Sequence, residues 1–154
     1  MKAVLQRVSH ARVSVDSRVT GEIDKGYLIL LGVMEGDGEE EMKLLAKKTA
    51  ELRVFEDKNG KMNLSVLDID GSALVVSQFT LCADVSHGRR PSFIKSAKPE
   101  IANELYEAYV RELRNNGIKN VQTGEFGADM AVELLNDGPV TILFDTDEWK
   151  KKNH

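Results

Sequence analysis

Seven consecutive residues, Tyr27-Leu28-Ile29-Leu30-Leu31-Gly32-Val33, constrain the fold of this chain more than any other segment. A continuous apolar run of this length is typical of a strand that is buried on both faces. The run is far shorter than the roughly 18 apolar residues that a membrane-spanning helix needs, and no run of that length occurs in the sequence. The segment therefore predicts a buried strand, and we expect no membrane span.

Further strands are indicated by alternating or apolar segments that end at turn residues. Asp57-Lys58-Asn59-Gly60 contains the Asn-Gly step that favours a tight hairpin, so residues 53–56 and 62–65 are predicted to pair. Residues 130–135 fit a helix or a strand by periodicity, and their β-rich flanks favour a strand. The other predicted strands cover residues 2–8, 12–16, 73–81, 119–122 and 140–144, the first two being joined by Ser9-His10-Ala11.

Two helices are predicted from apolar residues at helical spacing. Residues 39–52 follow a break at Gly36-Asp37-Gly38 and begin with three glutamates, which favour a helix N-terminus. Pro99 opens the second helix, and Gly117 is placed to end it. The apolar positions are Met42, Leu45, Ala46, Thr49 and Leu52 in the first helix and Ile101, Leu105, Tyr109 and Leu113 in the second. Because strands outnumber helices, the sequence predicts an α+β domain rather than a doubly wound α/β sheet.

The length of 154 residues favours a single domain, residues 1–154, in which a polar tail over residues 146–154 is expected to fray. The only cysteine, Cys82, leaves no partner for an intrachain disulfide. The first eight residues lack the apolar core of a signal peptide. These observations favour a cytoplasmic protein.

The net charge of −4 is unevenly distributed along the chain. Residues 85–99 contain Arg89, Arg90, Lys95 and Lys98 but no Asp or Glu, so the rest of the chain carries −8. An acidic chain is not typical of a general nucleic-acid coat protein. A small positive patch on an acidic body fits a localised anionic group, such as a nucleotide or a tRNA end, and it fits a solvated basic loop equally well.

Conventional metal and nucleotide motifs do not occur in this sequence. The three histidines, His10, His87 and His154, lack metal-ligand spacing, and no glycine-rich phosphate loop follows a strand. The acidic run 36–41 lacks the alternating carboxylates of a calcium loop, so a solvated helix N-terminus is the favoured interpretation. We therefore expect neither a metal nor a cofactor.

Nucleophilic side chains are also poorly supported. Cys82 has no recognisable activating partner and is expected to be a buried, inert thiol. The Thr80 hydroxyl needs a general base to attack a substrate, and none is evident nearby, so a structural or hydrogen-bonding role is favoured. On the predicted strand 73–81, Gln78 and Thr80 share one face, opposite Ser77 and Phe79.

Asn136-Asp137-Gly138-Pro139-Val140-Thr141 contains an unusual backbone step. Glycine tolerates almost any φ, whereas proline fixes its own φ and has no N–H. A Gly-Pro step can thus present main-chain carbonyls at a surface with little side-chain bulk. Together with Ser77-Gln78-Phe79-Thr80-Leu81 and Gly88-Arg89-Arg90-Pro91-Ser92-Phe93, this segment resembles the defining motifs of the D-aminoacyl-tRNA deacylases, also called D-tyrosyl-tRNA deacylases. The likeness runs essentially from end to end, with the small departure that Cys82 stands where the family commonly has Tyr.

The resemblance implies hydrolysis of the ester that joins a D-amino acid, or mischarged glycine, to the 3′-terminal adenosine of tRNA. It also implies a mainly antiparallel, barrel-like sheet and a homodimer in which the Gly-Pro step, with a cis peptide bond, enters the partner's active site. There its two carbonyls would accept a hydrogen bond from the substrate ammonium and leave no room for an L side chain. The family is thought to need no side-chain base, with the ribose 2′-OH assisting the attacking water and backbone N–H groups near Phe79 and Thr80 stabilising the oxyanion.

Carried onto this sequence, the resemblance assigns three groups of residues. The catalytic group is Ser77, Gln78, Phe79 and Thr80; the chiral-selectivity group is Gly138, Pro139, Asn136, Arg7 and Met130; the group for the tRNA 3′-adenosine is Ser86, Arg89, Pro91, Ser92 and Phe93. An acyl-accepting Thr80 remains the competing mechanism. A non-catalytic dimeric module that binds tRNA 3′ ends or nucleotides remains the alternative function, since fold alone does not fix the substrate.

Overall fold

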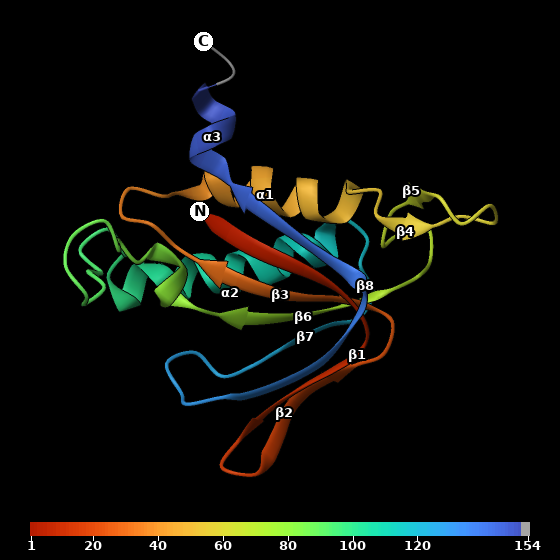
Figure 1. The fold of residues 1–154 in the computed structure, drawn as a ribbon, viewed down its shortest axis with the longest axis horizontal. Helices are drawn as coiled ribbons and strands as arrows, with labels where there is room; N and C mark the ends of the chain where they lie inside the picture. The colour runs from red at the N-terminus through yellow and green to blue at the C-terminus, as the bar shows by residue number, and fades with distance from the viewer. Residues whose placement is uncertain (152–154) are drawn as a thin grey trace.

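The fold is organised around one long strand, β1, which pairs antiparallel with β2, β3 and β8. The computed structural model describes residues 1–151. β6 lies parallel to β3 and β7 lies parallel to β6, which gives a strongly curved sheet in the order β2-β1-β3-β6-β7 with β8 on β1 (Figure 1). The strands are β1 (Lys2–Val15), β2 (Arg18–Ile23), β3 (Gly26–Gly32), β4 (Phe55–Glu56), β5 (Met62–Leu64), β6 (Ser72–Ser77), β7 (Val121–Thr123) and β8 (Ala131–Asp145). The predicted α+β class with a barrel-like sheet is confirmed, although two of its strand pairings are parallel.

The buried strand and the hairpin are confirmed as β3 and as β4 with β5, but β1 and β8 are longer than predicted. Two separate strands were expected over residues 2–8 and 12–16, and this expectation is wrong. Against β8, β1 shifts register around Val8, and such bulges bend a strand without ending it. β1 therefore pairs with β3 in its first half and with β2 in its second half. β8 likewise joins the predicted segments 130–135 and 140–144.

β6 ends at Ser77, four residues before the end of the predicted strand 73–81. The chain then makes a 3₁₀ turn, η1 (Phe79–Cys82), in which the Leu81 N–H donates to the Gln78 carbonyl at 3.2 Å. The neighbouring strand β3 stops at Gly32, so no ladder partner is available further on. A Cβ on Gly32 would lie 3.0 Å from the Leu81 Cβ, so the turn packs where the glycine has no side chain. The expected alternation of Gln78 and Thr80 against Ser77 and Phe79 is therefore wrong.

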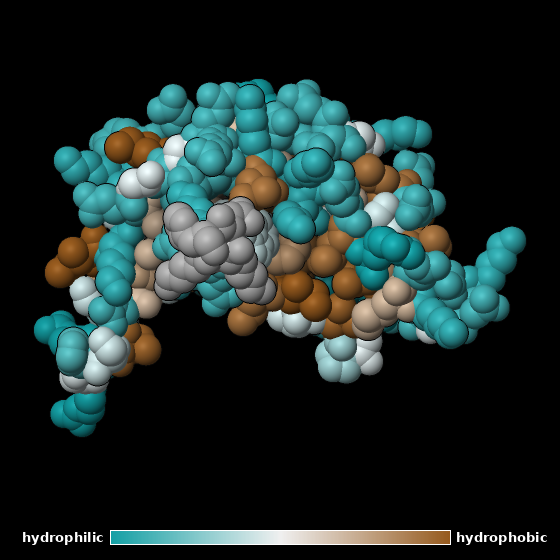
Figure 2. All heavy atoms as spheres, turned by 90° about the horizontal axis from the view of Figure 1, so that it is seen from above, coloured by the Kyte–Doolittle hydropathy of each residue, from teal (hydrophilic) through white to brown (hydrophobic). Residues whose placement is uncertain are grey.

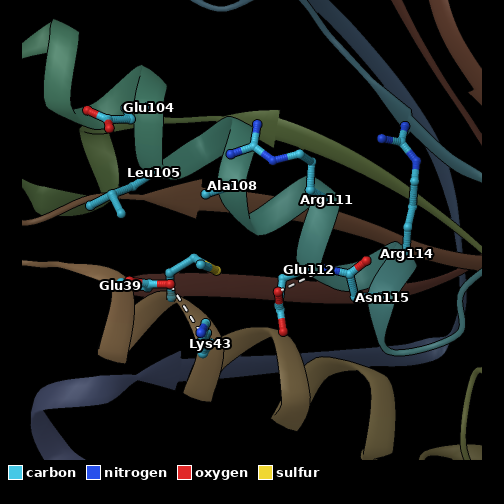
Figure 3. Close-up of a pocket in the computed structure, with 10 residues that line it drawn as sticks. Glu39, Lys43, Glu104, Leu105, Ala108, Arg111, Glu112, Arg114 and Asn115 are labelled. Carbon is cyan, nitrogen blue, oxygen red and sulfur yellow. Dashed lines mark hydrogen bonds and ion pairs between the residues drawn. The ribbon is translucent and has the colours of Figure 1, made fainter.

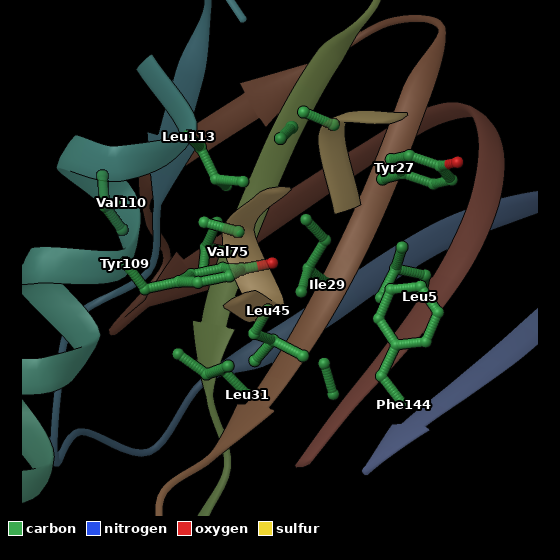
Figure 4. Packing of buried hydrophobic residues seen from close by; sticks show 14 of the residues in the cluster. Leu5, Tyr27, Ile29, Leu31, Leu45, Val75, Tyr109, Val110, Leu113 and Phe144 are labelled. Atoms are coloured by element: carbon green, nitrogen blue, oxygen red, sulfur yellow. The ribbon is translucent and has the colours of Figure 1, made fainter. Parts of the chain in front are cut away.

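Two long helices, α1 (Glu39–Glu51) and α2 (Pro99–Asn115), are confirmed and pack on one face of the sheet. In Figure 4, Tyr109, Val110 and Leu113 point from α2 toward β3 and β6. These side chains belong to the main buried cluster, which also includes residues of both strands. The buried face of α2 differs from the predicted one, since Ile101 is 48% exposed and Ala102, Tyr106 and Val110 are buried. The prediction used a strict spacing of four residues, which drifts around a helix of 3.6 residues per turn. The buried positions alternate spacings of three and four and so stay on one face: Ala102, Tyr106, Tyr109, Val110 and Leu113.

The C-terminal segment is ordered where fraying was expected. Residues 146–151 form helix α3 (Thr146–Lys151), and its Trp149 ring packs edge-on against Phe144 with centroids 5.2 Å apart. Lys150 forms an ion pair with Glu41, which also accepts a hydrogen bond from the Gly38 N–H at 3.1 Å at the start of α1. The acidic run is thus a helix N-terminus, as predicted, but Glu41 is buried rather than solvated. Residues 152–154, the rest of the predicted frayed tail, lie outside the described residues.

Candidate functional site

A pocket of about 810 Å³ opens where β6 ends, and two of the three sequence motifs meet there. Ser77, Gln78, Phe79 and Thr80 form one side of it, at the end of β6 and in η1. Phe93 and Met130 also line it, and the rest of the lining includes Leu31, Val33, Val76, Ala97, Ala102 and Val132. The four predicted catalytic residues therefore share one largely apolar pocket with Met130 and Phe93.

Phe79 and Phe93 hold the two motifs together. Their rings pack edge to face with centroids 5.0 Å apart, although Phe79 is more than half exposed. The loop between them closes on itself, because Asp84 and Ser92 exchange two backbone hydrogen bonds of 2.8 and 2.9 Å. Exposed Phe79 and half-buried Phe93 both line the pocket, where their rings can contact a flat ring of a ligand.

The residues predicted to bind the adenosine and its phosphates are only partly brought together. Phe93 lines the pocket, whereas Ser86, Arg89 and Pro91 lie on the exposed loop before it, and half-buried Ser92 closes that loop. The Ser86 hydroxyl donates to the Asp84 carboxylate at 2.6 Å, and this bond holds the pKa of Asp84 below its usual value. The hydroxyl of Ser86 is therefore already engaged within the loop.

The Gln78 side chain donates a hydrogen bond to the Thr80 hydroxyl at 2.9 Å. Among the described residues that line the pocket, the ionisable side chains belong to Lys98, Tyr106 and Asp129. Burial raises the pKa of Tyr106 to about 12, so its hydroxyl stays protonated at neutral pH. Cys82 is buried, as expected, and burial raises the pKa of its thiol. A nucleophile with an adjacent base is therefore not assembled from the described side chains of this pocket.

A second aromatic pair lines the pocket and was not predicted from the sequence. Tyr106 of α2 and Phe126 of the β7–β8 loop also line the pocket, with ring centroids 5.9 Å apart. The Tyr106 hydroxyl donates to the Val75 carbonyl of β6 at 3.0 Å, which fixes α2 against the strand that leads into Ser77. Neither residue belongs to a short motif, because the pocket brings them together only through packing of α2 and of the loop on β6.

The Gly138–Pro139 step forms a bulge in β8 opposite Arg7, and its peptide bond is cis. Thr141 pairs with Gln6 and Asn136 pairs with Val8, so four residues of β8 face the single residue Arg7. The Asn136 carboxamide closes the bulge by accepting from the Val140 N–H at 2.8 Å. Both Gly138 and Pro139 are exposed.

Arg7 is buried beneath this bulge, with its side chain 5% exposed. Its Nε donates to the Asp137 carbonyl at 2.8 Å, so in this chain it holds the Gly-Pro segment of its own subunit. Arg7, Asn136, Gly138 and Pro139 do not contribute to the lining of the pocket within one chain. The predicted site residues thus lie in the pocket, on the exposed loop beside it and at the Gly-Pro bulge, and β8 runs from the pocket to the bulge (Figure 1).

A separate cavity of about 510 Å³ lies between α1 and α2, away from all three motifs. Figure 3 shows its charged rim, where Lys43 pairs with Glu39 and Asn115 contacts Glu112. Over residues 1–151, no group of three His, Cys, Asp or Glu side chains is arranged to hold a metal ion. In the same part of the chain, no helix is both long and apolar enough to cross a membrane.

Comparison with known proteins identifies the class to which this fold and pocket belong. The family model described as D-Tyr-tRNA(Tyr) deacylase matches residues 4–145, which include all three motifs. The chain therefore belongs to that family, and the expectation that it is a deacylase enzyme is confirmed.

Particular relatives agree with this assignment. A D-aminoacyl-tRNA deacylase of Roseiflexus castenholzii is 61% identical over 146 residues, which cover 95% of this chain and 92% of that protein. One of Thermosipho africanus is 55% identical over 146 residues, which cover 95% of this chain and 97% of that protein. A solved structure described as c-Myc DNA Unwinding Element Binding Protein is similar with a TM-score of 0.89 at 39% identity, covering 94% of this chain and 98% of that one.

Proposed function

We propose that this protein hydrolyses the ester bond of D-aminoacyl-tRNA, and of mischarged glycyl-tRNA, and releases the free amino acid and tRNA. The observation that carries the proposal is the single pocket in which Ser77, Gln78, Phe79 and Thr80 meet Phe93 at the end of β6. The family to which the chain belongs supports the same reaction.

The pocket is suited to the terminal adenosine of tRNA. Two aromatic pairs, Phe79 with Phe93 and Tyr106 with Phe126, line the same cavity, and bases stack readily on aromatic side chains. Residues 85–99 contain no Asp or Glu, and although Lys95 pairs with Asp84 at 3.5 Å, exposed Arg89 and Arg90 of the adjoining loop can attract the phosphates. Substrate binding would thus combine apolar stacking with a local positive charge on an acidic protein.

The reaction needs a stabilised oxyanion and an activated water. The first N–H groups of a 3₁₀ turn have no acceptor within the turn, and in η1 these belong to Phe79 and Thr80. Both residues line the pocket, so these two N–H groups are our candidates for the oxyanion contacts. We assign activation of the water to the 2′-OH of the terminal ribose, because the lining offers no nucleophile paired with a base.

We further propose that two copies of the chain assemble and that the Gly138–Pro139 step of one copy completes the pocket of the other. Its exposed bulge lies outside the pocket of its own subunit, which supports action on a partner. Carbonyls at this step would accept from the substrate ammonium and exclude an L side chain, while glycine, with no side chain, would pass.

An apolar row on the outer face of the sheet supports the dimer. Val4 pairs across strands with Leu143 on one side and Leu30 on the other, on the face opposite the helices. Leu143 is 75% exposed. Figure 2, which views the molecule from above, shows a surface of mostly hydrophilic side chains with smaller groups of apolar ones between them. Val4 and Leu30 are half-buried, so Leu143 is the exposed member of this row, and an apolar side chain uncovered to this degree fits a surface that a partner buries.

Incubation with D-Tyr-tRNA, L-Tyr-tRNA and Gly-tRNA tests the proposal. We expect release of D-Tyr and glycine but not of L-Tyr. Gly138→Ala should abolish the D-Tyr reaction, because a Cβ there would lie 2.6 Å from the Val140 nitrogen at a φ of +154°. If the pure, folded protein binds the tRNA but releases no D-Tyr, the non-catalytic module that binds tRNA 3′ ends is the better interpretation. A monomer in solution that is fully active would contradict the shared site.

A further inference from the structure

Gly124 follows β7 directly and has no conformational reason to be glycine. Its φ lies outside the left-handed region, where other glycines of the chain are found. Its N–H donates to the Val75 carbonyl at 3.2 Å, which extends the pairing of β7 with β6 by one residue. The φ of Gly124 therefore does not exclude a residue with a side chain, and the constraint on this position is the space around its Cα.

The space is taken by Met130. A Cβ built on Gly124 would lie 2.6 Å from the Met130 Sδ and 3.3 Å from a methyl group of Val13. Cβ atoms in real structures stay at least 3.0 Å from such neighbours, so the Met130 Sδ would have to move away from a Cβ on Gly124. The Val13 methyl group would need to shift by only a few tenths of an ångström. The thioether of Met130 therefore rests directly against the Gly124 backbone.

The residues and the cavity around Met130 limit the directions in which its side chain can move. Met130 packs on the buried cluster that contains Val13 and Val76, and it also lines the pocket. A methyl group on Gly124 would push the thioether away from the β7–β8 loop, while the buried cluster, packed to interior density, has little room to receive it. The pocket is the open side.

We infer that Gly124 is a positioning residue. Because it has no side chain, the Met130 thioether can lie against its backbone, and this position of Met130 sets the room in the pocket that is available to the substrate. This inference rests on the proposed function for the identity of the ligand, the aminoacylated 3′ end of tRNA. Methionine has three rotatable bonds and adapts to its surroundings, so displacement of its end costs little in folding. A side chain on Gly124 should therefore weaken ligand binding much more than it lowers thermal stability.

A double-mutant cycle tests this role directly. The probe is 3′-(D-tyrosylamino)-3′-deoxyadenosine, an amide that cannot undergo ester hydrolysis, and its affinity is measured by calorimetry beside kcat and KM for D-Tyr-tRNA. We expect Gly124→Ala to weaken binding of the probe and raise KM about tenfold, in line with the cost of overpacking. In a Met130→Ala background, where the blocking thioether is absent, the same substitution should change the affinity less than about twofold.

Gly38→Ala is the matched control, because a Cβ there would meet its nearest neighbour, the Glu41 Oε2, at an ordinary 3.8 Å. It should leave the affinity for the probe unchanged. The inference is overturned if Gly124→Ala binds the probe like the wild type, or if its effect persists in the Met130→Ala background. Failure of the wild type to bind the probe or to release D-Tyr would instead count against the proposed function. A crystal structure of Gly124→Ala tests the inference independently of the proposed function. A Met130 side chain displaced into the pocket supports the inference, and an unmoved one overturns it.

Discussion

The Arg7 Nε atom donates a hydrogen bond to the main-chain carbonyl of Asp137 at 2.8 Å, directly before the Gly138–Pro139 step. A second nitrogen of the same guanidinium donates to the Val54 carbonyl at 2.8 Å, and Glu56 approaches to 3.8 Å. Arg7 thus joins β1, the bulge of β8 and the segment that leads into the β4–β5 hairpin. Because its side chain is buried, this junction is fixed by directional bonds rather than by a solvated charge.

Arg7→Ala should loosen the bulge and disturb the chemistry together. Loss of charged donors to two carbonyls is expected to lower the free energy of unfolding by about 3 kcal/mol. Misplacement of the Gly-Pro step should lower kcat/KM for D-Tyr-tRNA by roughly 100-fold. Chemical denaturation and single-turnover kinetics measure the two effects.

Arg12→Ala is the control for this prediction. Arg12 lies on the same strand, but it pairs with Glu133 on an exposed surface, where ion pairs contribute little. It should change neither activity nor stability appreciably. Equal losses in both variants would show that the bonds of Arg7 have no special role.

Phe93→Ala should weaken substrate binding with little effect on the chemical step. It removes the edge-to-face partner of Phe79 and one aromatic wall of the pocket, and stacking of a base on an aromatic side chain is typically worth enough to raise KM roughly tenfold. Ile94→Ala, at the next residue, removes a side chain that is 83% exposed and should leave KM unchanged. Steady-state kinetics with D-Tyr-tRNA compare the two, and a fall in kcat at unchanged KM would contradict the assignment.

Local signals in the sequence were sufficient for much of the fold. The apolar run 27–33 predicted β3, and the Asn59-Gly60 step predicted the hairpin of β4 and β5. In each case a short segment contains its own physical cause, a buried strand or a turn with a preferred φ. The resemblance to the family, and not a local signal, assigned residues 77–80 to the catalytic group and Phe93 to the adenosine group, and these residues line one pocket.

The missed features depend on contacts between distant segments. β6 ends at Ser77 because β3 ends beside it, and α3 contacts distant parts of the chain through Lys150 with Glu41 and Thr146 with Met1. Tyr106 and Phe126 reach the pocket from a helix and a loop whose meeting no local pattern encodes. The same holds for the bulge opposite Arg7, which arises from the register of β8 on β1 rather than from either strand alone.

Thr80→Ala should retain turnover within about tenfold of the wild type, because loss of a true nucleophile costs far more, as in serine proteases. The Thr80 hydroxyl accepts a hydrogen bond from Gln78 at 2.9 Å, which is a structural contact and not activation by a base. Thr80→Ser keeps a hydroxyl and serves as the control. Single-turnover assays that find an active Ser variant beside an Ala variant slowed by several orders of magnitude would favour the nucleophile.

The ion pair between Glu41 and Lys150 should make stability depend on pH in acid. The hydrogen bond from Lys150 lowers the pKa of Glu41 most, burial opposes this, and the N–H of Gly38 lowers it further. A carboxylate with a lowered pKa stabilises the fold above its unfolded value of about 4.3, and this contribution is lost as pH falls through the folded pKa. The pair ties α3 to the start of α1.

Glu41→Gln isolates this effect, because glutamine can still cap the helix through the Gly38 N–H. We expect the thermal midpoint to fall by roughly 2–4 °C at pH 7 and the difference from the wild type to shrink as the pH is lowered below the unfolded pKa of about 4.3. Glu39→Gln removes the same charge from the exposed pair with Lys43 and should lower the midpoint less. Calorimetric scans from pH 7 to pH 3 measure all three proteins. A deficit of Glu41→Gln that stayed constant across this range would show that the charge of Glu41 is not its source, and no deficit at pH 7 would show that the ion pair does not stabilise α3.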